Sequence, residues 1–227
     1  MKRIWLTTLV PVLALVACAM GSPVYTAEPF SAQVVDAETG QPIAGAVVVA
    51  NWELVGASLH GRRHLGQLEV KETVTDDNGR FHFDGFTRPN FALSELHEGA
   101  PRVLVFKGGY KANAYYSYID PPDLPRSTRK AGVDGQVLKL VRLKPTKTGP
   151  KDERLEFHFS LRGLVSDIVR DCQWSNIPRL LQAMDREKRR LRAEQPGADV
   201  GIGVEDFVGQ SRLDCKLDAD TVRGYLR

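Results

Sequence analysis

The hydrophobic pattern between residues 29 and 145 is typical of short β-strands. Apolar and polar residues alternate there over runs of roughly four to eight positions, which indicates strands that bury one face. In the run 80–84, for example, Phe81 and Phe83 lie on one side and His82 lies on the other. We expect strands at 30–35, 43–50 (with a possible extension to 54), 70–75, 80–84, 102–107, 113–119 and 137–143.

Turn residues separate these runs, and no helical repeat interrupts them. The tetrapeptide Asp76-Asp77-Asn78-Gly79 predicts a hairpin, because Asn-Gly favours the positive φ angles of a tight turn. Short strands joined in this way favour an antiparallel β-sandwich. The stretches 55–68 and 121–135 do not fit the pattern, and we expect them to be loops at the rim of the sandwich.

The hydrophobic period changes to that of helices after a polar linker that begins at residue 146. A first helix is indicated by apolar residues that recur every three or four positions, namely Leu161, Leu164, Val165, Ile168, Val169 and Cys172. A second helix is expected over 177–194, with Asn176 as its cap and Pro178 in its first turn. A third is expected over 218–227. The fold class is therefore mainly β, with a helical C-terminal region over 146–227.

The first 17 residues have the pattern of an export signal. Lys2 and Arg3 precede an apolar run, and fourteen residues span about 21 Å as a helix, short of the roughly 30 Å hydrocarbon core of a bilayer. The run ends in L-V-A-C, which resembles the lipobox of bacterial lipoproteins. The resemblance implies that residues 1–17 are removed and that Cys18 carries acyl chains that anchor the protein in a membrane. Residues 18–28 would then be a tether.

The identity of residue 19, which follows Cys18, indicates which membrane would hold the lipid anchor. In lipoproteins an Asp after the lipidated cysteine favours the inner membrane, and this chain has Ala19 instead. The resemblance thus implies the periplasmic face of the outer membrane if the cell is Gram-negative. The alternative is a plain secretory signal that is cut later, for instance after Ala27, which would discard Cys18.

Three motifs of the strand region resemble the carboxypeptidase regulatory-like domain. They are V-V-D-A-E-T-G-Q-P-I-A-G-A-V-V-V from residue 34, V-T-D-D-N-G-R-F-H-F from residue 74, and V-F-K-G-G-Y from residue 105. The resemblance covers 29–145 and implies a transthyretin-like (prealbumin-like) β-sandwich. In that family the domain is an accessory folding or interaction unit, and the motif residues have structural roles. The catalytic peptidase module of the family is absent from this sequence.

Composition and charge narrow the classes of partner. Hydrophobic residues make up 42% and charged residues 26% of the chain, as in ordinary globular proteins. The formal net charge is +3, of which Lys2 and Arg3 supply two, so a nucleic-acid partner is not expected. The run 185–192 is rich in arginine but contains acids, which is typical of a solvated helix face; binding to anionic lipid or cell-wall polymer is the alternative.

The cysteine count agrees with export. If Cys18 is lipidated, Cys172 and Cys215 remain as the single possible pair. Disulfides form in oxidising compartments outside the cytosol, so we expect these two residues to be bonded. Two buried free thiols are the alternative.

Candidate catalytic and metal-binding residues are few. His60 and His64 are four positions apart, but glycines surround them, Arg62 and Arg63 lie between them, and the Glu of an H-E-x-x-H zinc motif is missing. No nucleophile motif of the G-x-S-x-G type and no phosphate-binding glycine loop occurs. The sequence therefore predicts no catalytic residues, no metal and no cofactor, and we do not expect an enzyme.

One aromatic group remains as a candidate ligand surface. It consists of Tyr110, Tyr115, Tyr116 and Tyr118. Aromatic faces stack on sugar rings, although alternating tyrosines in a strand are also common in a core or at a sheet edge. We therefore expect a non-enzymatic lipoprotein that acts as a binding or structural module for an envelope protein. Carbohydrate or peptidoglycan binding through these tyrosines is the alternative.

Overall fold

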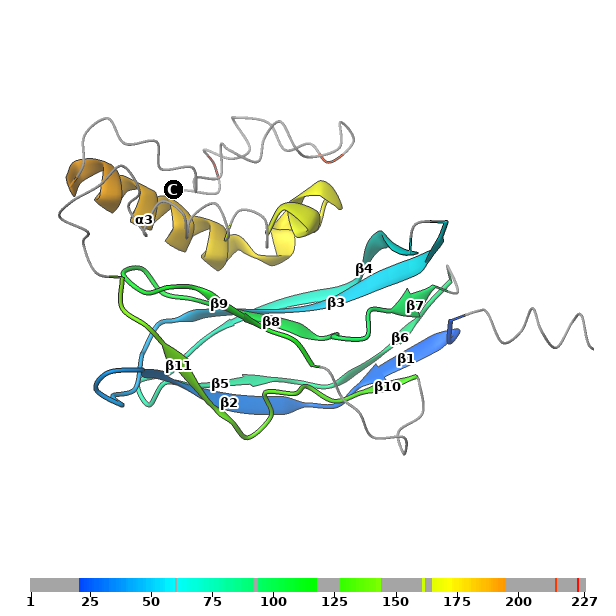
Figure 1. Ribbon diagram of the computed structural model, residues 1–227, viewed down its shortest axis with the longest axis horizontal. Helices are drawn as coiled ribbons and strands as arrows, with labels where there is room; N and C mark the ends of the chain where they lie inside the picture. The colour runs from blue at the N-terminus through cyan, green and yellow to red at the C-terminus, as the bar shows by residue number, and fades with distance from the viewer. Residues whose placement is uncertain are drawn as a thin grey trace, which may run out of the picture.

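The computed structural model describes residues 21–59, 61–91, 94–117, 127–143, 161, 165–194, 215 and 224. The chain forms a β-sandwich with helices packed on the outside of one sheet (Figure 1). The prediction of a mainly β fold followed by a helical region is confirmed.

One layer of the sandwich is built from two short sheets. The first has the order β10-β1-β6 and the second β11-β2-β5. The bounds are β1 Val24–Ala27, β2 Phe30–Asp36, β5 Arg80–Phe83, β6 Phe86–Pro89, β10 Thr128–Arg129 and β11 Val137–Leu140. In this layer the β1–β6 and β2–β5 pairs are antiparallel, and the β1–β10 and β2–β11 pairs are parallel.

The facing layer has the order β4-β3-β8-β9, and β7 also pairs with β3. Its strands are β3 Val47–Ser58, β4 Gly61–Val74, β7 Glu95–Leu96, β8 Arg102–Phe106 and β9 Asn113–Tyr115. The β3–β4 pair forms a long hairpin with register shifts between Trp52 and Glu53 and between Leu54 and Val55. Such irregularities bend a strand and increase its twist.

Strand β3 contributes to two hydrophobic cores. Val48, Ala50 and Trp52 belong to the core between the two layers. Val47 and Val49 belong to a second core, between this sheet and the helices. Because successive side chains of a strand point to opposite faces, burial on both sides explains the continuous apolar run in this strand.

The helical layer covers the outer face of the β3–β8 sheet. Residues 165–170 are helical, a 3₁₀ turn η1 follows at Trp174–Asn176, and α3 spans Pro178–Glu194. Val165, Ile168 and Val169 pack in the second core with Leu180 and Met184 of α3. The apolar stripes predicted for both helices therefore face the sheet.

A carboxylate of the sheet caps the start of α3. Glu72 of β4 accepts hydrogen bonds from the backbone N–H groups of Arg179 (2.9 Å) and Leu180 (2.6 Å). The first N–H groups of a helix have no partner within the helix, so an outside acceptor stabilises its start. Burial raises the pKa of the Glu72 carboxyl above its ordinary value.

Three sequence-based expectations need correction. The stretch 55–68 was expected to be a loop, but β3 continues to Ser58 and β4 begins at Gly61. The turn at Asp76–Gly79 does not make a hairpin; it leads from β4 in one layer to β5 in the other, and β5 pairs with β2. Within the expected tether 18–28, residues Val24–Ala27 form β1.

Candidate functional site

The tyrosines proposed as a ligand surface do not share one exposed face. Tyr110 and Tyr115 are half-buried and pack against the core of the sandwich. Tyr116 is 41% exposed. Tyr118 lies outside the described residues. Two of the three placed rings are thus turned inward, which weakens the hypothesis of sugar stacking.

Tyr110 instead belongs to a cluster around a buried aspartate. Its hydroxyl donates to Oδ2 of Asp36 (2.9 Å), and Arg142 donates to the same oxygen. The other oxygen, Oδ1, accepts the backbone N–H groups of Glu38 (2.9 Å) and Thr39 (3.0 Å). The N–H group of Thr39 is the main cause that holds the pKa of Asp36 well below its usual range, against the opposing effect of burial. The Asp-x-x-Thr-Gly motif is thus a turn closed by its own aspartate.

A second cluster of polar residues surrounds His64. Its Nδ1 lies 2.8 Å from Oε1 of Glu53, and its Nε2 contacts Oδ2 of Asp171. Gln67 also donates to Oδ2 of Asp171, at 3.1 Å. Glu53 comes from β3, His64 and Gln67 from β4, and Asp171 from the end of the helical segment 165–170. The cluster therefore joins the β3–β4 hairpin to the helical layer.

The two carboxylates determine the charge of this histidine. Burial is the largest single influence and lowers the pKa of His64, but the hydrogen bonds and charges of Glu53 and Asp171 together outweigh it. The pKa of His64 therefore lies above its ordinary value. A protonated imidazole donates through both ring nitrogens, as two flanking carboxylates require.

This geometry favours a structural contact over acid–base catalysis. A general base needs a free ring nitrogen within reach of the proton that it abstracts, and both ring nitrogens of His64 already face a carboxylate. His60, the other member of the predicted pair, lies outside the described residues. Across the described ranges, no three His, Cys, Asp or Glu side chains are grouped so that they could hold a metal ion.

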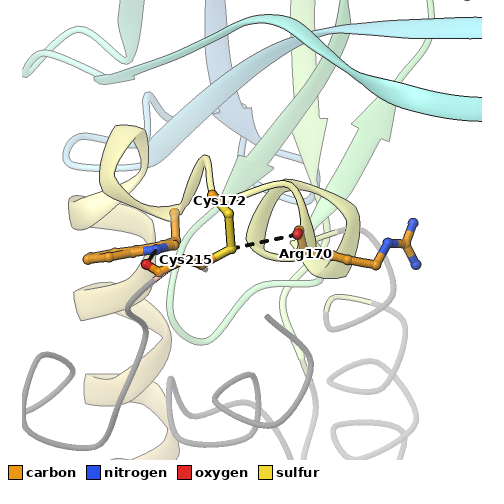
Figure 2. Close-up of a disulfide and its surroundings, with 4 residues drawn as sticks. Arg170, Cys172 and Cys215 are labelled. Carbon is orange, nitrogen blue, oxygen red and sulfur yellow. Dashed lines mark hydrogen bonds between the residues drawn. A yellow bond between two sulfur atoms is a disulfide. The ribbon is translucent and has the colours of Figure 1, made fainter. Parts of the chain in front are cut away.

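The predicted disulfide is present directly after Asp171. Cys172 and Cys215 are bonded, with a Cα–Cα distance of 5.0 Å (Figure 2). The Sγ of Cys215 lies 3.8 Å from the carbonyl oxygen of Arg170, and the indole of Trp174 donates to the backbone oxygen of Cys215 at 3.4 Å. The bond therefore attaches the C-terminal region to the turn that also presents Asp171 to His64.

The arginine-rich run of α3 is only partly a solvated face. Asp185, Glu187 and Lys188 are buried. Oε1 of Glu187 accepts the backbone N–H of Gly109 (3.0 Å), and its two oxygens accept both Nη2 and Nε of Arg190. That contact raises the pKa of Arg190 above its ordinary value. The run therefore fastens α3 to the loop after β8, which the sequence pattern did not indicate.

A polar groove lies beside the start of α3. It has a volume of about 610 Å³ and lies between β4, β5 and the start of α3. Polar and charged side chains line it, among them Lys71, Thr73, His82 and Arg179. The groove is open, and its lining includes both positively and negatively charged side chains. Such a lining suits a peptide or protein surface more than a small apolar ligand.

Sequence reasoning missed the partners of His64 and the cap of α3. Glu53 stood out only as a charged residue in an apolar strand, and Asp171 is 107 positions from His64. The one available signal for the His64 partners was that Asp171 lies next to Cys172, which was expected to form a disulfide.

No protein-family model matches the chain, and a search of curated proteins found no match. Several solved structures are similar to this chain at low sequence identity. A 3-chlorocatechol 1,2-dioxygenase from Rhodococcus opacus is 18% identical, with a TM-score of 0.29, and the match covers 53% of this chain and 60% of that one. A 9R-lipoxygenase from Cyanothece is 13% identical (TM-score 0.26), with 94% of this chain and 32% of that one covered.

The third similar structure is the C-terminal domain of the shaft pilin SpaA from Lactobacillus rhamnosus. It is 12% identical, with a TM-score of 0.23, and the match covers 53% of this chain and 99% of that domain. The chain spans less than two thirds of the dioxygenase and of the lipoxygenase. None of these similarities bears on the activity of this chain. Within the described part of the chain, no helix is long and apolar enough to cross a bilayer.

Proposed function

We propose that this protein is a non-enzymatic lipoprotein of the cell envelope, anchored through acyl chains on Cys18, that serves as a binding or structural module for a protein partner. Residues 29–145 would be a carboxypeptidase regulatory-like domain, an accessory unit in its family. The absence of Asp after Cys18 favours the periplasmic face of the outer membrane in a Gram-negative cell.

The place of β1 in the fold carries this proposal. Cleavage before Cys18 leaves all of β1 in the mature protein. Cleavage after Ala27, the alternative, would remove β1 from between β6 and β10, together with the buried side chains of Tyr25 and Ala27. A mature protein without its middle strand would expose the edges of both neighbours, which is unfavourable.

Two further observations support the proposal. The Cys172–Cys215 disulfide fits an oxidising compartment such as the periplasm. The His64 cluster has its ring nitrogens engaged with carboxylates, so it offers no free base. The polar groove between β4, β5 and α3 is the surface that we expect a protein partner to use.

The anchor is tested by replacing Cys18 with Ala and measuring incorporation of labelled palmitate and partition between membrane and soluble fractions. We expect Cys18→Ala to lose the label and to leave the membrane fraction. Met20→Ala is the matched control, since it keeps the lipobox, and should stay labelled. Retention of label by Cys18→Ala, or a mature N-terminus other than residue 18, would contradict the proposal.

The partner is tested by crosslinking the lipidated protein in its native envelope and comparing wild type with Lys71→Glu/Arg179→Glu. Both side chains line the groove, so the charge reversal should abolish a specific protein crosslink. A crosslink that the reversal leaves unchanged would exclude the groove, and recovery of glycan alone would favour the carbohydrate-binding alternative.

A further inference from the structure

We propose that the end of the sandwich at which β1 begins is a membrane-docking surface, which inserts Leu59 and Phe91 into the headgroup region of the bilayer. The inference rests on the proposed lipidation of Cys18. It adds a fixed orientation, in which the protein lies against the lipid surface instead of moving freely on a tether.

The link between the anchor and the folded domain is short. Gly21 packs so closely against the Ser94 carbonyl that a side chain at this position would clash. The backbone oxygens of Ser22 and Pro23 accept hydrogen bonds from Asn90, each at 2.7 Å. Gly21 is three positions after Cys18, and an extended chain spans at most about 3.6 Å per residue, or about 11 Å in total. The acyl chains therefore hold this end of the domain at the membrane surface.

The same end presents two large apolar side chains to solvent. Leu59, in the turn between β3 and β4, is 100% exposed, and Phe91, just after β6, is 92% exposed. Figure 1 shows the tip of the β3–β4 hairpin, the end of β6, β7 and the start of β1 at one end of the sandwich, away from α3. Single exposed apolar residues are common in proteins, but the elements that carry these two lie at the same end of the sandwich as the start of β1.

Hydrogen bonds and an ion pair fix the tip of the β3–β4 hairpin, β7 and the residues after β6 relative to one another. Arg62 at the hairpin tip lies 2.8 Å from the Glu95 carboxylate of β7, and β7 pairs with β3. Asn90, next to Phe91, also donates to the Ser94 carbonyl at 2.7 Å. Leu59 and Phe91 therefore lie on a rigid surface. Little conformational entropy is lost when their side chains insert into the bilayer.

Charge at the hairpin tip suits an interface with lipid phosphates. Arg63 is exposed and follows Leu59 closely in the hairpin, whereas the neighbouring Arg62 is paired with Glu95. Long basic side chains next to apolar ones are typical of surfaces that lie in the headgroup region, where the apolar group enters the acyl boundary and the cation stays with phosphate.

The test places a tryptophan at each apolar position of the full-length lipidated protein. The variants Leu59→Trp and Phe91→Trp are reconstituted in vesicles of phosphatidylethanolamine and phosphatidylglycerol that contain phosphatidylcholine brominated on its acyl chains, which quenches indoles within the bilayer. Val141→Trp is the matched control: this residue is 50% exposed and follows β11 at the opposite end of the sandwich. The signal of wild type, from Trp52 and Trp174, is subtracted.

We expect the brominated lipid to remove about half or more of the added fluorescence in Leu59→Trp and Phe91→Trp, and to leave Val141→Trp unchanged. Equal and weak quenching at all three positions of vesicle-bound protein would overturn the docking inference and leave the anchor intact. The tryptophans at positions 59 and 91 could instead be shielded from an aqueous quencher in native envelopes but not in vesicles. That result would assign this end of the sandwich to a protein partner. Loss of vesicle attachment by wild-type protein would refute the anchor itself.

Discussion

His64 is held by two carboxylates from different parts of the chain. Glu53 lies across the hairpin and Asp171 lies at the end of a helix in another layer. All three side chains are largely shielded from water, so the charged imidazole is stabilised mainly by these contacts. At the scale of single residues this contact joins the sheet to the helical layer by charge, and the protonation of His64 makes the contact sensitive to pH near neutrality.

The sign of that sensitivity follows from the raised pKa of His64. The folded state binds the proton more tightly than the unfolded state, so the contribution to stability is complete below the ordinary pKa of about 6.5 and is lost as pH rises through the folded value. Urea unfolding of wild type and His64→Gln at pH 5.5, 7 and 9 should show the difference in unfolding free energy shrinking as pH increases. A difference that is constant with pH would contradict the assignment.

Sequence reasoning predicted neither the strand that carries His64 nor the partners of its side chain. The strand periodicity correctly put Phe81 and Phe83 inside and His82 outside, because alternation is a local property of the chain. A contact over 107 positions depends on how separate layers pack, which no local pattern encodes. Tyr110 was misleading for the same reason: its hydroxyl is committed to Asp36, which is distant in sequence.

At the scale of elements, α3 depends on the sheet for its first turn. Glu72 replaces the side-chain cap that Asn176 was expected to supply: the amide of Asn176 instead donates to Gln173 at 2.6 Å. The bounds of α3 were predictable from its apolar stripe and from Pro178, whereas the cap was not. Likewise, the glycines and arginines of 55–68 masked the continuation of β3 and β4, since local propensity in a hairpin yields to pairing with a long partner strand.

Removal of this cap should weaken the helix locally. Glu72→Ala is expected to lower the free energy of unfolding by about 1 kcal/mol, the usual effect of losing a helix cap, and to increase amide hydrogen exchange at Arg179 and Leu180. Glu69→Ala on the same strand is the control, because Glu69 pairs with Arg88 and not with α3. Unchanged exchange at the first turn of α3 in Glu72→Ala would show that the cap is unimportant.

At the scale of the whole molecule, a sandwich and a helical layer share one sheet, and a disulfide closes the outer layer. The bond joins residues 43 positions apart. By the chain-entropy argument such a loop stabilises the folded state by about 4 kcal/mol. Cys172→Ser/Cys215→Ser should therefore unfold at lower urea than oxidised wild type, and wild type under reducing conditions should match it. Equal stability of the oxidised and reduced forms would contradict this prediction.

The burial of both faces of β3 affects how the register between β3 and its partner strands is selected. From Val47 to Ala50 both faces are apolar, so hydrophobicity alone does not distinguish the native alignment from one slipped by a single residue. A slip would drive the Glu53 carboxylate between the sheets and turn the Trp52 ring out towards the helices. The charged half of the hairpin thus disfavours mispaired strands. It also determines which side chains of the apolar half point into the core between the two sheets.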